Sequence, residues 1–192
     1  MRSLLAAAGV ALLAALTGAC TAAEEAKPTA AATAADAKKG TTVEWAGMKS
    51  TTPADWKREE PTSRLRQDQF RVPRAEGDKE DAEVAVFYLP GGGGVEANLK
   101  RQIAAFEKDK VKEKQEKIKV GPHNAVYQEV SGTFLKKPFP MAEKGTPMPG
   151  YKQLYVIFEG KDGAVASAWL RGPEKTVDQH KKEFDEWVKA FK

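Results

Sequence analysis

Residues 83–109 read EVAVFYLPGGGGVEANLKRQIAAFEKD, and their pattern indicates the fold class. The opening run, Glu83–Leu89, is apolar on both faces, which predicts a central β-strand. Pro90 and four glycines then provide a connector. Beyond it, apolar side chains recur at helical spacing over residues 95–109, and these are Val95, Leu99, Ile103 and Phe106. This spacing predicts an amphipathic helix that packs on the sheet.

Strand patterns occur on both sides of this unit. They cover residues 43–48, 54–57, 64–72, 118–120, 125–130, 133–135, 151–159 and 164–171. The polar segment 64–72 suits a position near a sheet edge and ends at Pro73. The last two strands flank Gly160–Gly163 and form the clearest hairpin of the chain.

The sequence closes with a second amphipathic helix. Gly172 and Pro173 open it, because proline suits the first helical turn. Its apolar stripe consists of Val177, Phe184, Trp187, Val188 and Phe191. Two helices separated by hairpin-connected strands predict an α+β domain, with a largely antiparallel sheet of about six or seven strands packed with two main helices.

This order of elements resembles the PsbP-like or Mog-like α/β/α sandwich. The Pro-x-x-Trp of residues 53–56, the strand, glycine loop and helix unit, and the Phe/Trp-rich final helix carry the resemblance. The phrases AEGDKEDAEVAVFYLPGGGG (75–94) and GPEKTV (172–177) are also similar to those of small bacterial envelope lipoproteins. The resemblance covers most of residues 43–192 and implies an accessory or binding module. No family active-site motif transfers to this sequence.

The N-terminus has the pattern of an export signal. Arg2 is followed by 16 uncharged residues, Leu4–Ala19, many of them alanine. A membrane-spanning helix needs roughly 20 apolar residues, so this run is too short and too weakly apolar to be an anchor. We interpret residues 1–19 as a secretory signal peptide.

The single cysteine of the chain, Cys20, follows this run directly. Leu16, Thr17, Gly18, Ala19 and Cys20 resemble the lipobox of bacterial lipoproteins, although Leu16 lies one position further from the cysteine than in the best examples. The resemblance implies a diacylglyceryl group on Cys20 and cleavage before it. Two or three acyl chains hold a protein on a membrane essentially permanently. The alternative is ordinary secretion with cleavage after Ala19.

Residues 21–42 form a segment of a different character. They are mostly Ala, Thr, Lys and Glu and contain no aromatic or large aliphatic side chain. Such a segment buries too little apolar area to offset the entropy of ordering, so we expect residues 20–42 to be a lipidated cysteine and a disordered tether. Residues 43–192 then form one α+β domain.

Composition narrows the function classes. The 192 residues include 31 Lys and Arg, 27 Asp and Glu, two His and one Cys, and the mean hydropathy is −0.53. This excludes a multi-span membrane protein, an internal disulfide and the usual Cys/His four-ligand zinc sites. We expect no cofactor, no metal and no catalytic set. The export signal makes nucleic acid an improbable partner.

Three features of the sequence are of kinds that occur in catalytic or binding sites. The glycine connector, Gly91–Gly94, lacks the Lys-Ser/Thr of a phosphate-binding loop. His123 and His180 lack an obvious nucleophile and suit surface or boundary positions. Glu83, Glu129 and Glu159 lie in predicted strands, and a pair of them would support the alternative of an envelope enzyme with a carboxylate-based hydrolytic site.

Two further stretches suit contacts with a partner. Residues 108–119, KDKVKEKQEKIK, carry a local excess of lysine that can face an anionic surface, or else form a solvated helix end and loop. Residues 136–150 form a longer proline-rich loop with three apolar side chains, and such loops are often functional. Its predicted partner-binding residues are Phe139, Met141 and Met148.

These observations predict an exported, lipid-anchored protein of the bacterial envelope that faces the periplasm or the cell exterior. We expect it to act as a non-catalytic accessory or binding module. The expected partners are the membrane, through the lipid on Cys20, and an envelope protein or anionic polymer.

Overall fold

The computed structural model describes residues 39–139 and 142–192. The predicted signal peptide, Cys20 and most of the predicted tether lie outside these residues. In the part of the chain that is described, no helix has the length and apolar character needed to cross a membrane.

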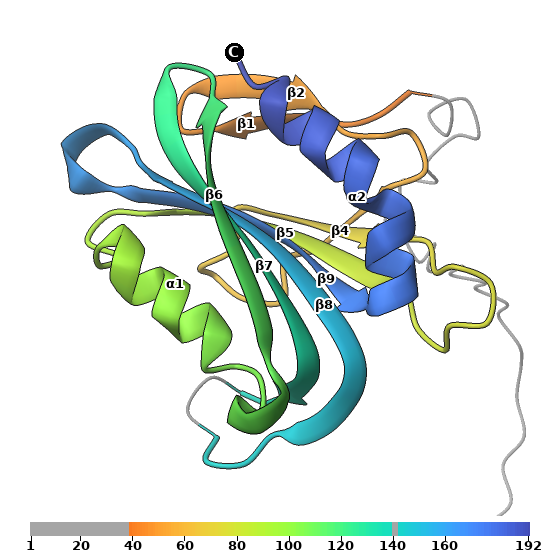
Figure 1. The fold of residues 1–192 in the computed structure, drawn as a ribbon. Helices are drawn as coiled ribbons and strands as arrows, with labels where there is room; N and C mark the ends of the chain where they lie inside the picture. The colour runs from red at the N-terminus through yellow and green to blue at the C-terminus, as the bar shows by residue number, and fades with distance from the viewer. Residues whose placement is uncertain (1–38, 140–141) are drawn as a thin grey trace, which may run out of the picture. The chain divides into compact units, whose positions relative to one another are not determined.

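The described chain contains nine strands, two α-helices and two short 3₁₀ segments, and Figure 1 shows their arrangement. In chain order they are β1 (Thr42–Trp45), β2 (Met48–Thr51), β3 (Lys57–Glu59), β4 (Asp68–Val72), β5 (Ala82–Leu89), α1 (Val95–Ile103), η2 (Lys108–Lys110), β6 (Lys112–Val120), β7 (His123–Lys136), β8 (Thr146–Glu159), η3 (Lys161–Gly163), β9 (Val165–Pro173) and α2 (Glu174–Lys189).

Seven strands form one antiparallel sheet in the order β3-β4-β5-β9-β8-β7-β6. The predicted central strand is β5, which lies between β4 and β9. Strands β1 and β2 form a separate hairpin. The prediction of an α+β domain with an antiparallel sheet of six or seven strands and two main helices is confirmed.

The two helices cover opposite faces of the sheet (Figure 1). Side chains along β8 alternate between these faces, as the two-residue period of a strand requires. Leu154 and Phe158 belong to the cluster that contains α2, whereas Tyr155 and Ile157 pack with Leu99 of α1. Both faces of β8 are therefore buried, and the domain is an α/β/α sandwich.

The larger core lies between the sheet and α2. The predicted apolar stripe is confirmed, because all five of its residues are buried in this core. Four of them lie in α2, and Phe191 lies just after the helix ends at Lys189. The β1–β2 hairpin closes one end of it. There Trp45 is fully buried, its indole donates a hydrogen bond to the Phe87 carbonyl (3.0 Å), and its ring lies edge-on to Phe191.

Helix α1 is shorter than the predicted helix over residues 95–109. It ends at Ile103, and Phe106 instead forms an isolated bridge with Phe134 of β7. The two rings lie 5.5 Å apart in a small cluster beneath the end of α1. Tertiary packing of Phe106 on β7 therefore replaces the last predicted turn of helix.

Two predictions about irregular segments are corrected. Most of the lysine-rich run 108–119 belongs to β6, a nine-residue edge strand whose first six side chains are exposed. The proline-rich loop is shorter than residues 136–150, because β8 begins at Thr146 and pairs with β7. In both cases pairing with β7 extends a strand into the segment, and the local composition of the segment does not reveal this pairing.

Candidate functional site

A cleft of about 560 Å³ lies on the α1 side of the sheet. Three loop segments surround it: the end of α1, the chain after β7 and the segment between β3 and β4. Its floor comes from β9. The cleft is lined by Thr62, Ser63, Arg66, Arg101, Ala104, Ala105, Phe134, Leu135, Lys137, Pro138, Phe139, Trp169 and Arg171. This size is in the range of small-molecule and side-chain binding sites.

Arg171 is the central cation of the cleft. Its guanidinium lies between two aromatic rings, 4.2 Å from the centre of Trp169 and 4.4 Å from the centre of Phe134. Burial lowers the pKa of Arg171 to about 10, although Glu83 opposes this effect. The side chain is still charged at neutral pH, so the floor of the cleft presents a fixed positive charge beside aromatic surface.

Arg66 lies next to Arg171, and both contact the carboxylate of Glu83. The Arg66 guanidinium donates to Glu83 (2.8 Å) and to the Gln69 amide oxygen (2.6 Å), and Arg171 is 3.9 Å from the same Glu83. Both arginine side chains are largely buried, with exposed fractions of 13% and 16%. One carboxylate therefore neutralises only one of two adjacent buried cations.

The glycine connector positions a third cation. Asn98 of α1 donates hydrogen bonds to the carbonyls of Gly92 and Gly94, and its side-chain oxygen accepts one from Arg101 (2.6 Å). In the described residues neither Arg101 nor Lys137 forms an ion pair with a carboxylate, and no acidic residue lines this cleft. The carboxylates of Glu80, Asp81 and Glu83 line the adjoining pocket on the other side of the two arginines. Four cations thus surround the cleft, which favours an anionic ligand.

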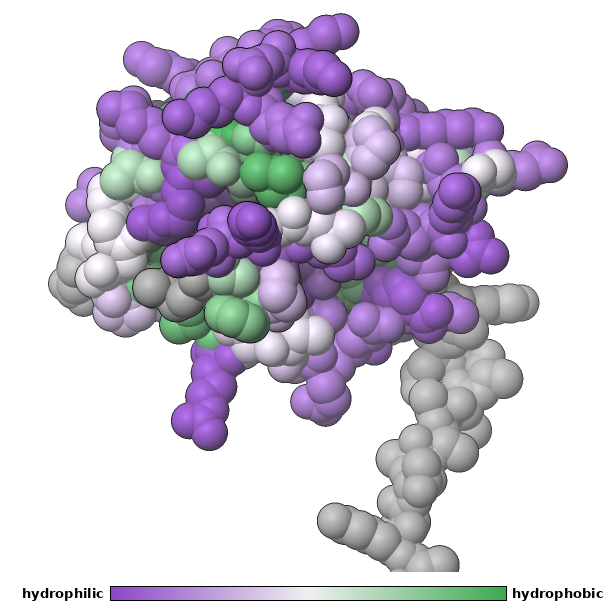
Figure 2. Space-filling view, turned by 90° about the horizontal axis from the view of Figure 1, so that it is seen from below, coloured by the Kyte–Doolittle hydropathy of each residue, from purple (hydrophilic) through white to green (hydrophobic). Residues whose placement is uncertain are grey.

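The predicted partner-binding loop borders this cleft. Phe139 lies on the rim and is 60% exposed, so it offers apolar surface next to the arginines. Met148 lies in β8 opposite Phe134 and is partly buried against the cluster beneath α1. Met141 lies outside the described residues. The end of the molecule that carries this loop shows apolar patches among mainly hydrophilic residues (Figure 2).

The three predicted strand carboxylates do not come together. Glu129 faces α2, where it pairs with Lys152 and Lys181. Glu83 and Glu159 lie on the α1 face, but their β9 partners are Arg171 and Val165, six residues apart. Six residues of strand span roughly 20 Å. These carboxylates therefore form no catalytic pair.

The two histidines differ in their surroundings. His123 is half-buried, and its ring stacks on Phe158 at 4.6 Å. His180 was predicted to lie at the surface or a boundary, but it is buried, with an exposed fraction of 4%. The prediction failed because the segment after β4 covers this side of α2, and its Pro73 carbonyl lies 2.9 Å from the His180 ring.

Comparison with known proteins gives a likeness in structure but not in sequence. No protein-family model matches the chain, and no curated protein matches it. The fold is similar to the solution structure of cyanobacterial PsbP (CyanoP) from Synechocystis sp. PCC 6803, with a TM-score of 0.48 and 13% sequence identity. The similarity covers 91% of this chain and 97% of that chain, and it concerns the fold alone.

Sequence reasoning missed the arginines of the cleft. Trp169 and Arg171 occupy alternate positions of β9 and so share one face, which is the one signal that the sequence offers. Arg66 joins them only through the strand order, because β5 separates β4 from β9 in the sheet. The sequence of residues 61–67 does not itself indicate that Arg66 lies beside Trp169 and Arg171.

Proposed function

We propose that this protein is a lipid-anchored lipoprotein of the bacterial cell envelope whose folded domain is a non-catalytic binding module. The α1-side cleft is its binding site for an anionic group next to an apolar surface. The proposal depends on Arg171. Its largely buried guanidinium lies between two aromatic rings and shares the carboxylate of Glu83 with Arg66, so it can bind a further anion.

The ligand class follows from the lining of the cleft. Guanidinium groups bind carboxylate and phosphate in a fixed, bidentate geometry. Trp169, Phe134 and Phe139 favour an apolar or planar group beside the anion. An acidic segment of an envelope protein and an anionic envelope polymer both offer this chemistry, which is the partner class expected from the sequence.

The lipid anchor is tested by mass spectrometry of the natural protein extracted from membranes. The expected product begins at Cys20 and carries added hydrocarbon. A Cys20→Ser variant should leave the membrane fraction. An intact Met1, or a terminus downstream of Cys20 without hydrocarbon, would contradict the anchor and leave the binding site as a separate question.

Anion binding is tested with the full chain in detergent and three probes of one shape: 1-naphthyl phosphate, 1-naphthoate and neutral 1-naphthalenemethanol. Fluorescence titration should show binding of the two anions and much weaker binding of the alcohol. Arg66→Gln should weaken anion binding about tenfold, which corresponds to about 1.4 kcal/mol.

The matched control for this experiment is Arg74→Gln. Arg74 is an exposed arginine that pairs with Asp81 and does not line the cleft. Its substitution should leave the affinity unchanged. Equal affinity for the alcohol and the anions, or equal losses in both variants, would refute the cleft as an anion site.

A further inference from the structure

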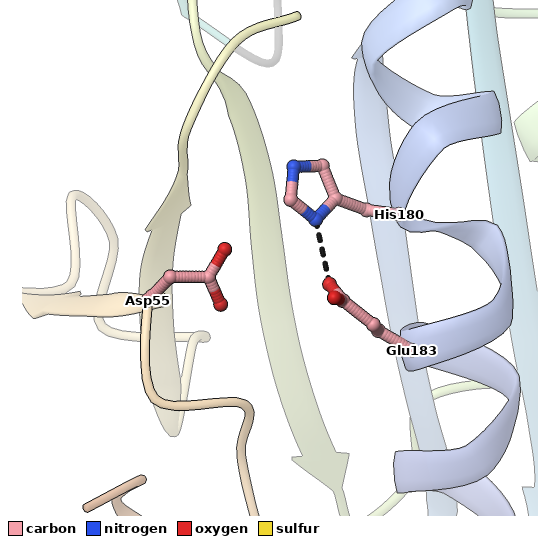
Figure 3. A group of neighbouring side chains, drawn as sticks. All are labelled: Asp55, His180 and Glu183. Carbon is pink, nitrogen blue, oxygen red and sulfur yellow. Dashed lines mark hydrogen bonds and ion pairs between the residues drawn. The ribbon is translucent and has the colours of Figure 1, made fainter. Parts of the chain in front are cut away.

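Three potential metal ligands converge on the opposite side of the sheet, next to α2. They are Asp55, His180 and Glu183, and one ligand atom of each lies within 4.8 Å of the other two. Asp55 comes from the turn before β3, whereas His180 and Glu183 are one turn apart on α2. Figure 3 shows the carboxylates and the imidazole pointing toward one another.

The orientation of the His180 ring is fixed from outside this group. Its Nε2 lies 2.9 Å from the Pro73 carbonyl oxygen. A carbonyl oxygen only accepts hydrogen bonds, so Nε2 carries a hydrogen. A backbone carbonyl that accepts from one ring nitrogen, while the other nitrogen faces the ligand, is the usual outer arrangement of a metal-bound histidine.

The second ring nitrogen faces the carboxylates. Nδ1 lies 2.7 Å from a carboxylate oxygen of Glu183. With its hydrogen on Nε2, the ring presents a lone pair at Nδ1 on the side of the carboxylates. An imidazole lone pair and carboxylate oxygens that face the same point can together be ligands of one metal ion.

The charge of this group suits a divalent cation. Asp55 and Glu183 contribute two negative charges, and within the described ranges neither forms an ion pair with Lys or Arg. A divalent ion balances both of these charges. One imidazole nitrogen and two carboxylate oxygens are a ligand set that suits Zn²⁺ and similar transition metals.

The surrounding packing holds the ligands in place. Trp56 follows Asp55 directly and packs on α2, with its ring centre 5.5 Å from that of Trp187. The segment after Pro73 is fixed to the start of α2, because Thr176 hydrogen-bonds to Ala75 and to Asp78. Two of the three ligands thus lie on a rigid helix, and the third lies beside a buried tryptophan.

We propose that His180 Nδ1, Glu183 and Asp55 bind a divalent transition-metal ion of the Zn²⁺ class, with water completing the coordination. Ligand atoms around tetrahedral zinc lie roughly 3.3 Å apart. To close the site, the exposed Asp55 side chain moves inward and the Glu183 carboxylate moves slightly away from Nδ1, from which it is 2.7 Å in the structure. The ion then links the turn at Asp55 to α2 on the outside of the core.

The proposal is tested with the full chain in detergent after removal of metals by a chelator. Calorimetric titration with ZnCl₂ should show one site, and CoCl₂ should produce the visible absorption of coordinated cobalt. Asp55→Asn and Glu183→Gln should each weaken Zn²⁺ binding at least tenfold. Zn²⁺ should raise the midpoint of thermal unfolding in the wild type and not in Asp55→Asn.

Glu186→Gln is the matched control, because Glu186 is an exposed carboxylate on the same helix. It should bind Zn²⁺ like the wild type. Asp55 is exposed, so Asp55→Asn is the variant whose folding is safest, and circular dichroism of the variants checks it. Absence of a Zn²⁺ site in the wild type, or equal affinity in Asp55→Asn, Glu183→Gln and Glu186→Gln, would overturn the proposal.

Discussion

At the scale of single residues, the α1-side cleft depends on a charge imbalance. Glu83 is the one carboxylate that contacts both Arg66 and Arg171, at 2.8 and 3.9 Å. It therefore has two opposing effects: it stabilises the folded domain by pairing with both cations, and it reduces the positive charge that a ligand meets.

Glu83→Gln should separate these two effects. Loss of the charged hydrogen bond to Arg66 should lower the free energy of unfolding by about 2 kcal/mol. The same change should tighten the binding of 1-naphthyl phosphate, because both arginines become free to pair with it. Urea unfolding and the fluorescence titration measure the two effects in the same preparation.

Glu80→Gln is the control, since Glu80 pairs with Lys136 at 3.5 Å and does not line the cleft of about 560 Å³. It should change neither quantity strongly. Weaker anion binding in Glu83→Gln would show that Glu83 itself contacts the ligand or positions the arginines.

Tyr127 gives the domain a predicted sensitivity to alkaline pH. Burial raises the pKa of Tyr127 above its ordinary value of 10.0, and its hydrogen bond to Asp185 raises this pKa further. The unfolded chain ionises this phenol from about pH 10 whereas the folded domain keeps it neutral. The stabilisation is therefore complete below pH 10 and is lost as the pH rises above it.

Tyr127→Phe should remove this contribution. Above pH 10 the stability of the variant should fall less steeply than that of the wild type, by up to about 1.4 kcal/mol per pH unit. The slope that remains comes from Tyr151 and Tyr155, because burial raises their pKa values as well. Urea unfolding followed by circular dichroism at about pH 8 and about pH 11 compares them. Tyr88→Phe should retain the slope, and equal slopes in all three proteins would contradict this assignment.

At the scale of elements, the apolar stripes are what the sequence predicts best. The four stripe residues of α2, and Phe191 just after it, are buried as expected, because a helix face repeats within one segment and needs no partner to be recognised. Strand β6 is the contrary case. Its residues KEKQEKIKV show no alternation, and only the pairing with β7 makes them a strand.

The charges of β6 protect an open sheet edge. An exposed strand with unpaired backbone groups associates with other strands unless charged side chains oppose this. Lys114→Val combined with Glu116→Val should therefore produce larger species in size-exclusion chromatography of the detergent-solubilised chain. Lys182→Val with Glu186→Val, on the exposed face of α2, should not do so. A monodisperse β6 variant would show that the charges are not needed there.

At the scale of the whole molecule, α2 closes the larger core. Phe184 is fully buried and contacts both Trp56 and Trp187. Phe184→Ala should lower the free energy of unfolding by about 3–5 kcal/mol, because it leaves a cavity among large rings. Phe139→Ala removes the same group from an exposed position and should cost less than about 0.5 kcal/mol. Similar losses in urea unfolding would show that α2 is not tightly packed.

The fold was more predictable than the sites for a physical reason. Strands, helices and their order depend on patterns within short segments. Both sites combine residues from distant segments: Arg66 before β4 meets Trp169 of β9, and Asp55 before β3 meets His180 of α2. The spacing of His180 and Glu183 is visible as a helical pair. The expectation of no metal counted mainly Cys and His, and the proposed set with two carboxylates stands beside it as an alternative to be tested.

The pairing of β5 with β9 also sets the order in which the domain can form. Strands β3 to β5 and strands β6 to β9 are each joined by neighbouring hairpins, whereas Val84 lies opposite Leu170 from the far end of the chain. Closing such a distant pairing is slow compared with forming local hairpins. The paired residues of β5 and β9 are mainly apolar, so a partly folded molecule exposes them to other molecules. Refolding at high concentration should therefore lose material to aggregation, and dilution should recover it.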